Sequence, residues 1–240
     1  MRSYTRHQLK QDSFTTSTAE TINWAVEHRS KLVAVGIVAA VILALLGGGW
    51  AYVNFRDQQA SAELALAIQK YNEPIRPAGT PATPDVPSFA SIQERDKTTN
   101  AEFERIANKY SFTQSAQVAR YFAGVTARDL GDNAGAEKDL QQVTASRYPE
   151  IVSLAKLALA AVYHDTNRNP QAIDIYKQLI DHPTVSVGKN TAQLALASLY
   201  ESMDQPNEAR HIYEQMQKDS PGTAVAQLAM QRLQALGKPQ

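Results

Sequence analysis

The sequence lacks cysteine, and it lacks an excess of charge of either sign. Without thiols there is no disulfide framework, no thiolate metal site and no cysteine nucleophile. The compartment stays open, because a chain in an oxidising space can do without thiols. The 24 basic residues are matched by 24 acidic ones, so the chain has none of the positive charge that binding to a phosphate backbone requires. Nucleic acid is therefore not expected as a partner.

Motifs for catalysis and metal binding are also scarce. The five histidines are not paired at helical spacing, so they do not offer two metal ligands on one helix face. Residues 165–169 begin like a calcium-binding loop, but Pro170 and Tyr176 stand where that loop needs glycine and glutamate. Gly131 and Gly135 are not followed by Gly-Lys-Ser/Thr, so they do not form a phosphate-binding loop. We expect no enzyme activity, cofactor, metal or small-molecule substrate.

What the sequence does have is one long apolar run. Residues 32–53 (LVAVGIVAAVILALLGGGWAYV) carry no charged side chain. At about 1.5 Å per residue, a helix of this length spans about 33 Å, roughly the hydrocarbon thickness of a bilayer. We therefore predict a transmembrane helix at 32–53, preceded by a tail at 1–31.

The charges that flank the run predict its orientation. The basic residues before it are Arg2, Arg6, Lys10, Arg29 and Lys31. Only Arg56 and Lys70 lie in the next twenty residues after it. Because basic flanks stay in the cytoplasm, the tail is expected to be cytoplasmic and the C-terminal part to face the periplasm of a bacterium. The prediction is a single-pass protein of the bacterial inner membrane.

A cleaved signal peptide is the alternative, since Ala60-Ser61-Ala62 resembles a small-residue cleavage site. Three features favour an uncleaved signal anchor instead. The segment before the run is long, the run exceeds the usual length of a signal-peptide core, and Arg56 and Asp57 lie between the run and the candidate cleavage site.

Small residues recur at every fourth position of the apolar run: Gly36, Ala40, Ala44 and Gly48. This spacing places them on one face of a helix, where they would let another transmembrane helix approach closely. The alternative is chance, because nine positions of the run are Gly or Ala.

Two segments follow the apolar run. Residues 54–71 are rich in helix formers and contain neither Gly nor Pro, which predicts a juxtamembrane helix with a loose apolar stripe at 55, 62, 66 and 68. Five prolines then fall between Pro74 and Pro87, so residues 72–97 are predicted to be a semi-extended Pro-rich linker. A proline-rich ligand for another domain is the alternative.

From residue 98 onward the sequence repeats at intervals of 36 and 37 residues. One series of small residues is Gly124, Ala160 and Ala197, and a second series is Ala136, Ala172 and Ala209. A larger apolar residue follows each member of the second series by four positions: Leu140, Tyr176 and Tyr213. Small residues where helices cross allow close backbone approach. The pattern predicts an all-α solenoid over 98–240.

These positions resemble the tetratricopeptide repeat, in which a small residue and an aromatic of the first helix pack against an alanine and an aromatic of the second. The resemblance implies three units, half a unit before them at 99–109 and a capping helix at 223–236. The units depart from the family pattern in being longer than the usual length of about 34 residues. Arg120, Lys156 and Gln193 also stand where the family has tryptophan.

The resemblance also implies a binding surface, the concave face lined by the first helix of each unit. Carried over residue by residue, this groove presents Tyr121, Val125, Arg128, Leu157, Ala161, His164, Leu194, Ser198 and Glu201. Some repeats of this family hold a C-terminal carboxylate with Lys and Asn, but Tyr121 and Val125 stand at those positions here. An apolar or helical segment is therefore the expected ligand. The alternative is that part of this face packs internally.

TINW at 21–24 precedes the predicted anchor, GGGWAY at 47–52 ends it, and a Gln/Ala/Ser-rich helix then leads to the degenerate repeats. This order of parts resembles the YfgM-like proteins, ancillary subunits of the bacterial SecYEG translocon. The resemblance implies a periplasm-facing adaptor that hands emerging proteins to membrane-anchored chaperones of the PpiD type. The implied partners are translocon subunits, a periplasmic chaperone and client polypeptides.

The residues alone indicate a membrane-tethered protein-interaction module. The alternative to a translocon adaptor is a scaffold subunit of an envelope-assembly or secretion complex. A translocon adaptor predicts contact between the anchor and channel subunits together with many transient clients, whereas a scaffold predicts one stoichiometric partner.

Overall fold

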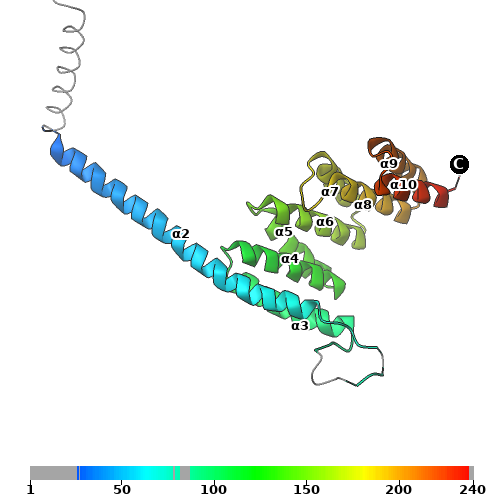
Figure 1. Ribbon diagram of the computed structural model, residues 1–240, viewed down its shortest axis with the longest axis horizontal. Helices are drawn as coiled ribbons and strands as arrows, with labels where there is room; N and C mark the ends of the chain where they lie inside the picture. Colours follow the sequence, from blue (N-terminus) through cyan, green and yellow to red (C-terminus); the bar gives the residue numbers. More distant parts are fainter. Residues whose placement is uncertain (1–25, 27, 78, 82–86, 238–240) are drawn as a thin grey trace, which may run out of the picture. The chain divides into compact units, whose positions relative to one another are not determined.

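The computed structural model describes residues 26, 28–77, 79–81 and 87–237, and this part of the chain is all-α, as the sequence predicts (Figure 1). It divides into two compact units, Met1–Asn54 and Phe55–Gln240. The long helix α2 (Arg29–Tyr71) begins in the first unit and ends in the second.

The described part of the first unit is dominated by the apolar half of α2. Among the described residues, α2 is the one helix that is long and apolar enough to cross a membrane, and no residue of its most apolar window is buried. The predicted span 32–53 and the small residues Gly36, Ala40, Ala44 and Gly48 all lie on it. Most of the predicted tail, including Arg2, Arg6, Lys10 and the TINW motif, lies outside the described residues.

The second unit is a row of antiparallel helical hairpins, in which each helix from α3 to α10 packs against the next one along the chain (Figure 1). The helices are α3 (Ile92–Lys109), α4 (Gln114–Asp129), α5 (Asn133–Thr144), α6 (Pro149–Asp165), α7 (Asn169–Asp181), α8 (Lys189–Ser202), α9 (Pro206–Asp219) and α10 (Ala224–Ala235). Three predicted repeat units correspond to α4–α5, α6–α7 and α8–α9, and α10 follows as the predicted capping helix.

The turn inside each repeat unit uses the same backbone conformation. Gly131, Asn167 and Asp204 adopt φ values of 83°, 58° and 57°. They lie 36 and 37 residues apart, and these residue types tolerate the left-handed region better than most. Helix ends are set by side-chain caps at Thr113, Asp132 and Thr223. Proline in the first turn marks the starts of α6, α7 and α9.

Close approach of the two helices explains why small residues recur. A Cβ atom added to Gly124 would lie 2.7 Å from Leu140 Cγ and 3.3 Å from the Ala136 carbonyl oxygen. Ala136 and Leu140 are fully buried, as are Ala160, Ala172, Ala197 and Ala209. The predicted packing of the first series against the second is confirmed.

The repeat fold begins earlier than residue 98. Ala60, Leu64 and Ala67 of α2 are buried in one apolar cluster with Phe103 and Ile106 of α3. The stripe expected at 55, 62, 66 and 68 is wrong, because Phe55, Ala62 and Leu66 are exposed and Ile68 is only half-buried. The segment 54–71 is therefore less a free juxtamembrane helix than the first half of a hairpin with α3.

Polar contacts reinforce this hairpin. Glu63 of α2 accepts hydrogen bonds of 2.7 Å from Arg105 Nη1, Lys109 Nζ and Tyr110 Oη. Lys109, then Tyr110, lower the pKa of Glu63 to about 2. Further along the pair, Lys70 Nζ lies 2.6 Å from Glu102 Oε1.

The Pro-rich segment differs from the expected linker in two ways. Helix α3 begins at Ile92, so residues 92–97 are helical, with Ser91 accepting the capping hydrogen bond from the Glu94 amide. The ends of the remaining loop are also paired, since the Arg76 amide donates to the Phe89 carbonyl at 2.9 Å and the Phe89 amide to the Pro74 carbonyl at 3.1 Å. Pro74, Pro77, Pro81 and Pro87 therefore lie in a loop inside a hairpin.

Candidate protein-binding groove

The nine predicted groove residues lie on the first helices of the three repeat units. Tyr121, Val125 and Arg128 are on α4, Leu157, Ala161 and His164 on α6, and Leu194, Ser198 and Glu201 on α8. Ser198 is exposed, and the other eight are half-buried. The nine positions form three rows across the helices, which differ in what they contact.

The row formed by Arg128, His164 and Glu201 links each unit to the next. Arg128 Nε lies 2.6 Å from Asp165 Oδ2 of α6. His164 Nε2 lies 3.3 Å from Ser202 Oγ of α8, and Glu201 Oε2 lies 3.9 Å from Arg232 Nη1 of α10. These side chains already have partners within the fold, so this row contributes more to stacking the units than to binding a ligand.

Two contacts made by this row also raise the pKa of a side chain. The hydrogen bond to Asp165 raises the pKa of Arg128, so its guanidinium stays charged. Burial, followed by the hydrogen bond to Glu201, raises the pKa of Tyr213. Tyr213 Oη is 2.8 Å from Glu201 Oε1, and the phenol therefore remains a neutral donor at physiological pH.

The row formed by Tyr121, Leu157 and Leu194 is apolar and partly committed to the core. Each of the three packs at the edge of a buried cluster of its own unit and its neighbours. Burial raises the pKa of Tyr121, whose ring also makes an edge contact with Phe122 at a centroid distance of 5.3 Å. The alternative reading of the sequence, internal packing, therefore applies to part of each side chain.

An apolar pocket lies beside Tyr121, between the N-terminal halves of α4 and α6. Its volume is about 360 Å³, within the range of small-ligand and side-chain pockets. The apolar side chains that line it are Val118, Tyr121, Phe122, Tyr148, Ile151 and Leu154. Polar groups at its edge come from Gln114 and Glu150, and the pKa of Glu150 is lowered by hydrogen bonds from Ser186. The pocket suits apolar side chains of a partner.

The sequence-based alignment missed most of this pocket. Of the nine predicted residues only Tyr121 lines it, whereas Val118 and Leu154 lie one helical turn before Tyr121 and Leu157. Their spacing of 36 residues was a usable signal. The signal stops at the third unit, because the equivalent residue is the exposed, polar Thr191. The pocket accordingly belongs to α4 and α6 and does not include Leu194.

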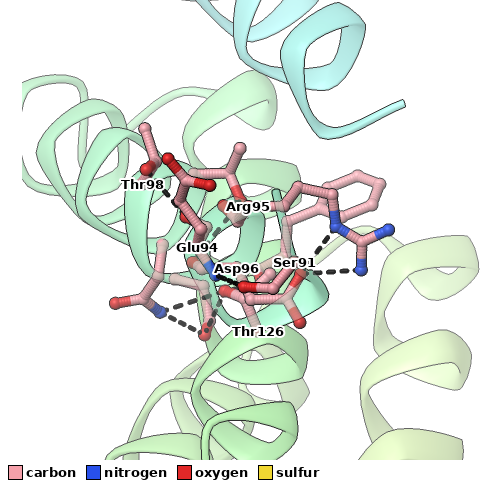
Figure 2. Close-up of polar contacts among 10 residues, drawn as sticks. Ser91, Glu94, Arg95, Asp96, Thr98 and Thr126 are labelled. Carbon is pink, nitrogen blue, oxygen red and sulfur yellow. Dashed lines mark hydrogen bonds and ion pairs between the residues drawn. The ribbon is translucent and has the colours of Figure 1, made fainter. Parts of the chain in front are cut away.

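A second cluster of polar residues, at the start of α3, has a structural role. Figure 2 shows Arg95 Nε donating to Asp96 Oδ1 at 2.8 Å, and Thr126 beside them on α4. Asn100 Nδ2 donates to the Ala123 carbonyl and to Thr126 Oγ1, which joins α3 to α4. Asp96 is fully buried and its Oδ2 accepts no hydrogen bond. In the described part of the chain, no group of three His, Asp or Glu side chains is placed to hold a metal ion.

Comparison with known proteins agrees with this architecture. The family model described as a tetratricopeptide repeat-like domain matches residues 24–238. The match extends through the apolar half of α2 as well as the helical hairpins. No curated protein and no solved structure matches the chain significantly.

Proposed function

Because the chain belongs to the tetratricopeptide repeat-like domain family, we propose that it is a membrane-anchored adaptor that binds apolar segments of other proteins. Helical repeats of this kind are protein-interaction folds. The apolar length of α2 supports the membrane anchor.

The observation that carries the proposal is the pocket between α4 and α6. Two parallel first helices present Val118, Tyr121 and Leu154 around one apolar cavity of about 360 Å³. An amphipathic helix or extended apolar segment can place anchor side chains in such a cavity. Burial of a few anchor side chains supplies most of the affinity in interfaces of this kind.

The more specific part of the proposal is the partner. Resemblance of the anchor region to the YfgM-like proteins supports a place beside the Sec translocon, in the bacterial inner membrane, with the repeats in the periplasm. There the groove would bind emerging polypeptides and pass them to a periplasmic chaperone. A channel delivers its substrates unfolded, with the apolar side chains that the pocket accepts still exposed.

Site-specific photocrosslinking tests both parts. A photoreactive residue at Leu154 of the full chain, in membrane vesicles that carry arrested translocation intermediates, is expected to crosslink to the translocating polypeptide. The matched control is Thr191, the equivalent position of α8, which lies outside the pocket. Crosslinks to a single stoichiometric partner, with or without translocation, would instead support a scaffold of an envelope complex.

Truncation of side chains that line the pocket measures how much each contributes to binding. For Leu154→Ala or Val118→Ala we expect a loss of about 2 kcal/mol, which is roughly thirtyfold in affinity for the crosslinked polypeptide. Thr191→Ala is expected to bind normally. Thermal unfolding of the same variants separates binding from packing, because loss of affinity without loss of Tm assigns the side chain to the ligand.

A further inference from the structure

The short loop between α3 and α4 holds one aromatic side chain out into solvent. Phe112 is 85% exposed, although Tyr110 and Thr113 on either side of it are only 3% exposed. The loop is well fixed, since Thr113 Oγ1 donates to the Tyr110 carbonyl at 2.9 Å and also caps α4. A single exposed apolar side chain is ordinary on a protein surface, so the significance of Phe112 depends on where its loop lies.

This loop is bonded to the part of α2 that directly follows the apolar run. Arg56 Nη2 donates to the Lys109 carbonyl at 2.7 Å, and its guanidinium lies 4.5 Å from the centre of the Tyr110 ring. The Ser115 amide donates to Asp57 Oδ1 at 2.9 Å. The loop is therefore held on both sides of Phe112 by two consecutive residues of α2.

The distance along the chain places these bonds near the membrane surface. Arg56 follows Val53, the last residue of the apolar run, by three residues. Three residues span at most about 11 Å when fully extended, and the headgroup layer on each side of a bilayer is about 5–8 Å thick. The length of chain alone therefore keeps groups bonded to Arg56 and Asp57 close to the lipid headgroups when 32–53 crosses the bilayer.

The chemistry of the loop suits that depth. Aromatic side chains partition favourably into the interfacial region, and Phe55, beside Arg56, is also 58% exposed. The nearby cations are largely engaged within the protein, because Lys109 pairs with Glu63 at 2.7 Å and Arg56 with the Lys109 carbonyl. An apolar contact is therefore favoured over electrostatic adsorption to anionic headgroups.

We propose that Phe112 inserts into the interfacial region of the bilayer that α2 crosses, and that the α3–α4 loop thereby holds the first hairpin of the repeat fold at the membrane surface. The inference rests on the proposed membrane anchoring of α2. Such a contact would hold the start of the solenoid near the membrane.

Tryptophan fluorescence in liposomes tests this contact. The full chain, with Trp24 and Trp50 replaced by Phe, is reconstituted in phosphatidylcholine vesicles with or without phosphatidylglycerol. Phe112→Trp then reports on the loop. Ile92→Trp is the matched control, because Ile92 is also exposed but lies at the other end of α3, about 26 Å away along an 18-residue helix.

We expect Phe112→Trp to emit at shorter wavelength and to be quenched several-fold more strongly by lipids with brominated acyl chains than Ile92→Trp, in both lipid mixtures. Equal quenching of the two would overturn the inference. Quenching that requires phosphatidylglycerol would also overturn it, in favour of electrostatic adsorption. Resistance of the vesicle-bound chain to alkaline extraction is measured on the same samples, so a failure of the anchor is seen separately from a failure of the loop contact.

Discussion

At the residue scale, Gly124 shows how one missing side chain sets the distance between two helices. Any Cβ at this position would meet Leu140 Cγ at 2.7 Å, and Leu140 is fully buried and surrounded by its cluster. For Gly124→Val we expect the free energy of unfolding to fall by about 2–3 kcal/mol, because overpacking forces the helices apart. Denaturant titration of the second unit measures the change.

Gly188→Val is the matched control for this substitution. Gly188 has φ −72°, an ordinary backbone conformation, and no atom within 4 Å of its added Cβ. We expect a change of less than about 0.5 kcal/mol. Adding Leu140→Ala to Gly124→Val should recover part of the loss, since it removes the clashing atoms. Purely additive effects would show that the contact does not limit the approach of the helices.

Also at the residue scale, the sequence predicted which positions carry small residues better than it predicted which charged side chains pair. The series of Gly124 and its equivalents was recoverable because close helix crossing admits only small side chains, and the same requirement returns in each unit. The pairing of Arg128 with Asp165 was not recoverable, because a charged residue at a repeat position has several candidate partners once the units stack. The pocket was missed beyond Tyr121 because Val118 and Leu154 have no apolar equivalent in α8.

At the element scale, the end of α2 forms a repeat hairpin with α3, although the sequence suggested a separate helix. In the sequence, Phe103 lies 37 residues before Leu140 and so extends the repeat, but about twenty residues with five prolines separate its helix from α2. An insertion inside a hairpin breaks the period without breaking the packing. Ala60 and Ala67 also lack the size that marks a core face in sequence.

This pairing predicts where a stable fragment begins. A fragment of residues 98–240 would expose Phe103 and Ile106, which are fully buried against α2. Burial of two such side chains contributes about 3 kcal/mol or more. Its Tm should therefore lie about 6 °C or more below that of a fragment of residues 55–240. Differential scanning calorimetry measures both.

A third fragment, beginning at residue 92, separates the contribution of α2 from that of the first turns of α3. It should melt close to the 98–240 fragment and, like it, bind an apolar dye at the exposed face of α3. If all three fragments melt together, α2 contributes nothing to the core and the repeat fold begins at α3.

At the scale of the whole molecule, α2 is one helix whose apolar half is the proposed anchor and whose last residues pack in the repeat fold. The Ala60-Ser61-Ala62 sequence lies in the interior of this helix, and Ala60 is fully buried in the cluster shared with α3. Cleavage after Ala62 would remove Ala60 from that cluster and break the contacts of Arg56 and Asp57 with residues 109–115. The fold therefore disfavours access of a signal peptidase to this site once α2 and α3 have paired.

We accordingly predict that the chain retains α2 and that the repeats lie on the outer side of the membrane. Protease added to spheroplasts should digest residues 55–240, while intact cells and inverted vesicles should protect them. The basic residues before 32–53 favour this orientation, and the buried Ala60 favours retention of α2. Mass spectrometry of the purified protein should find peptides that span residues 54–63, and a mature N-terminus at Glu63 would identify a soluble protein released from its signal sequence. Replacing Arg29 and Lys31 by Glu should weaken the orientation, which protease accessibility of inverted vesicles would detect.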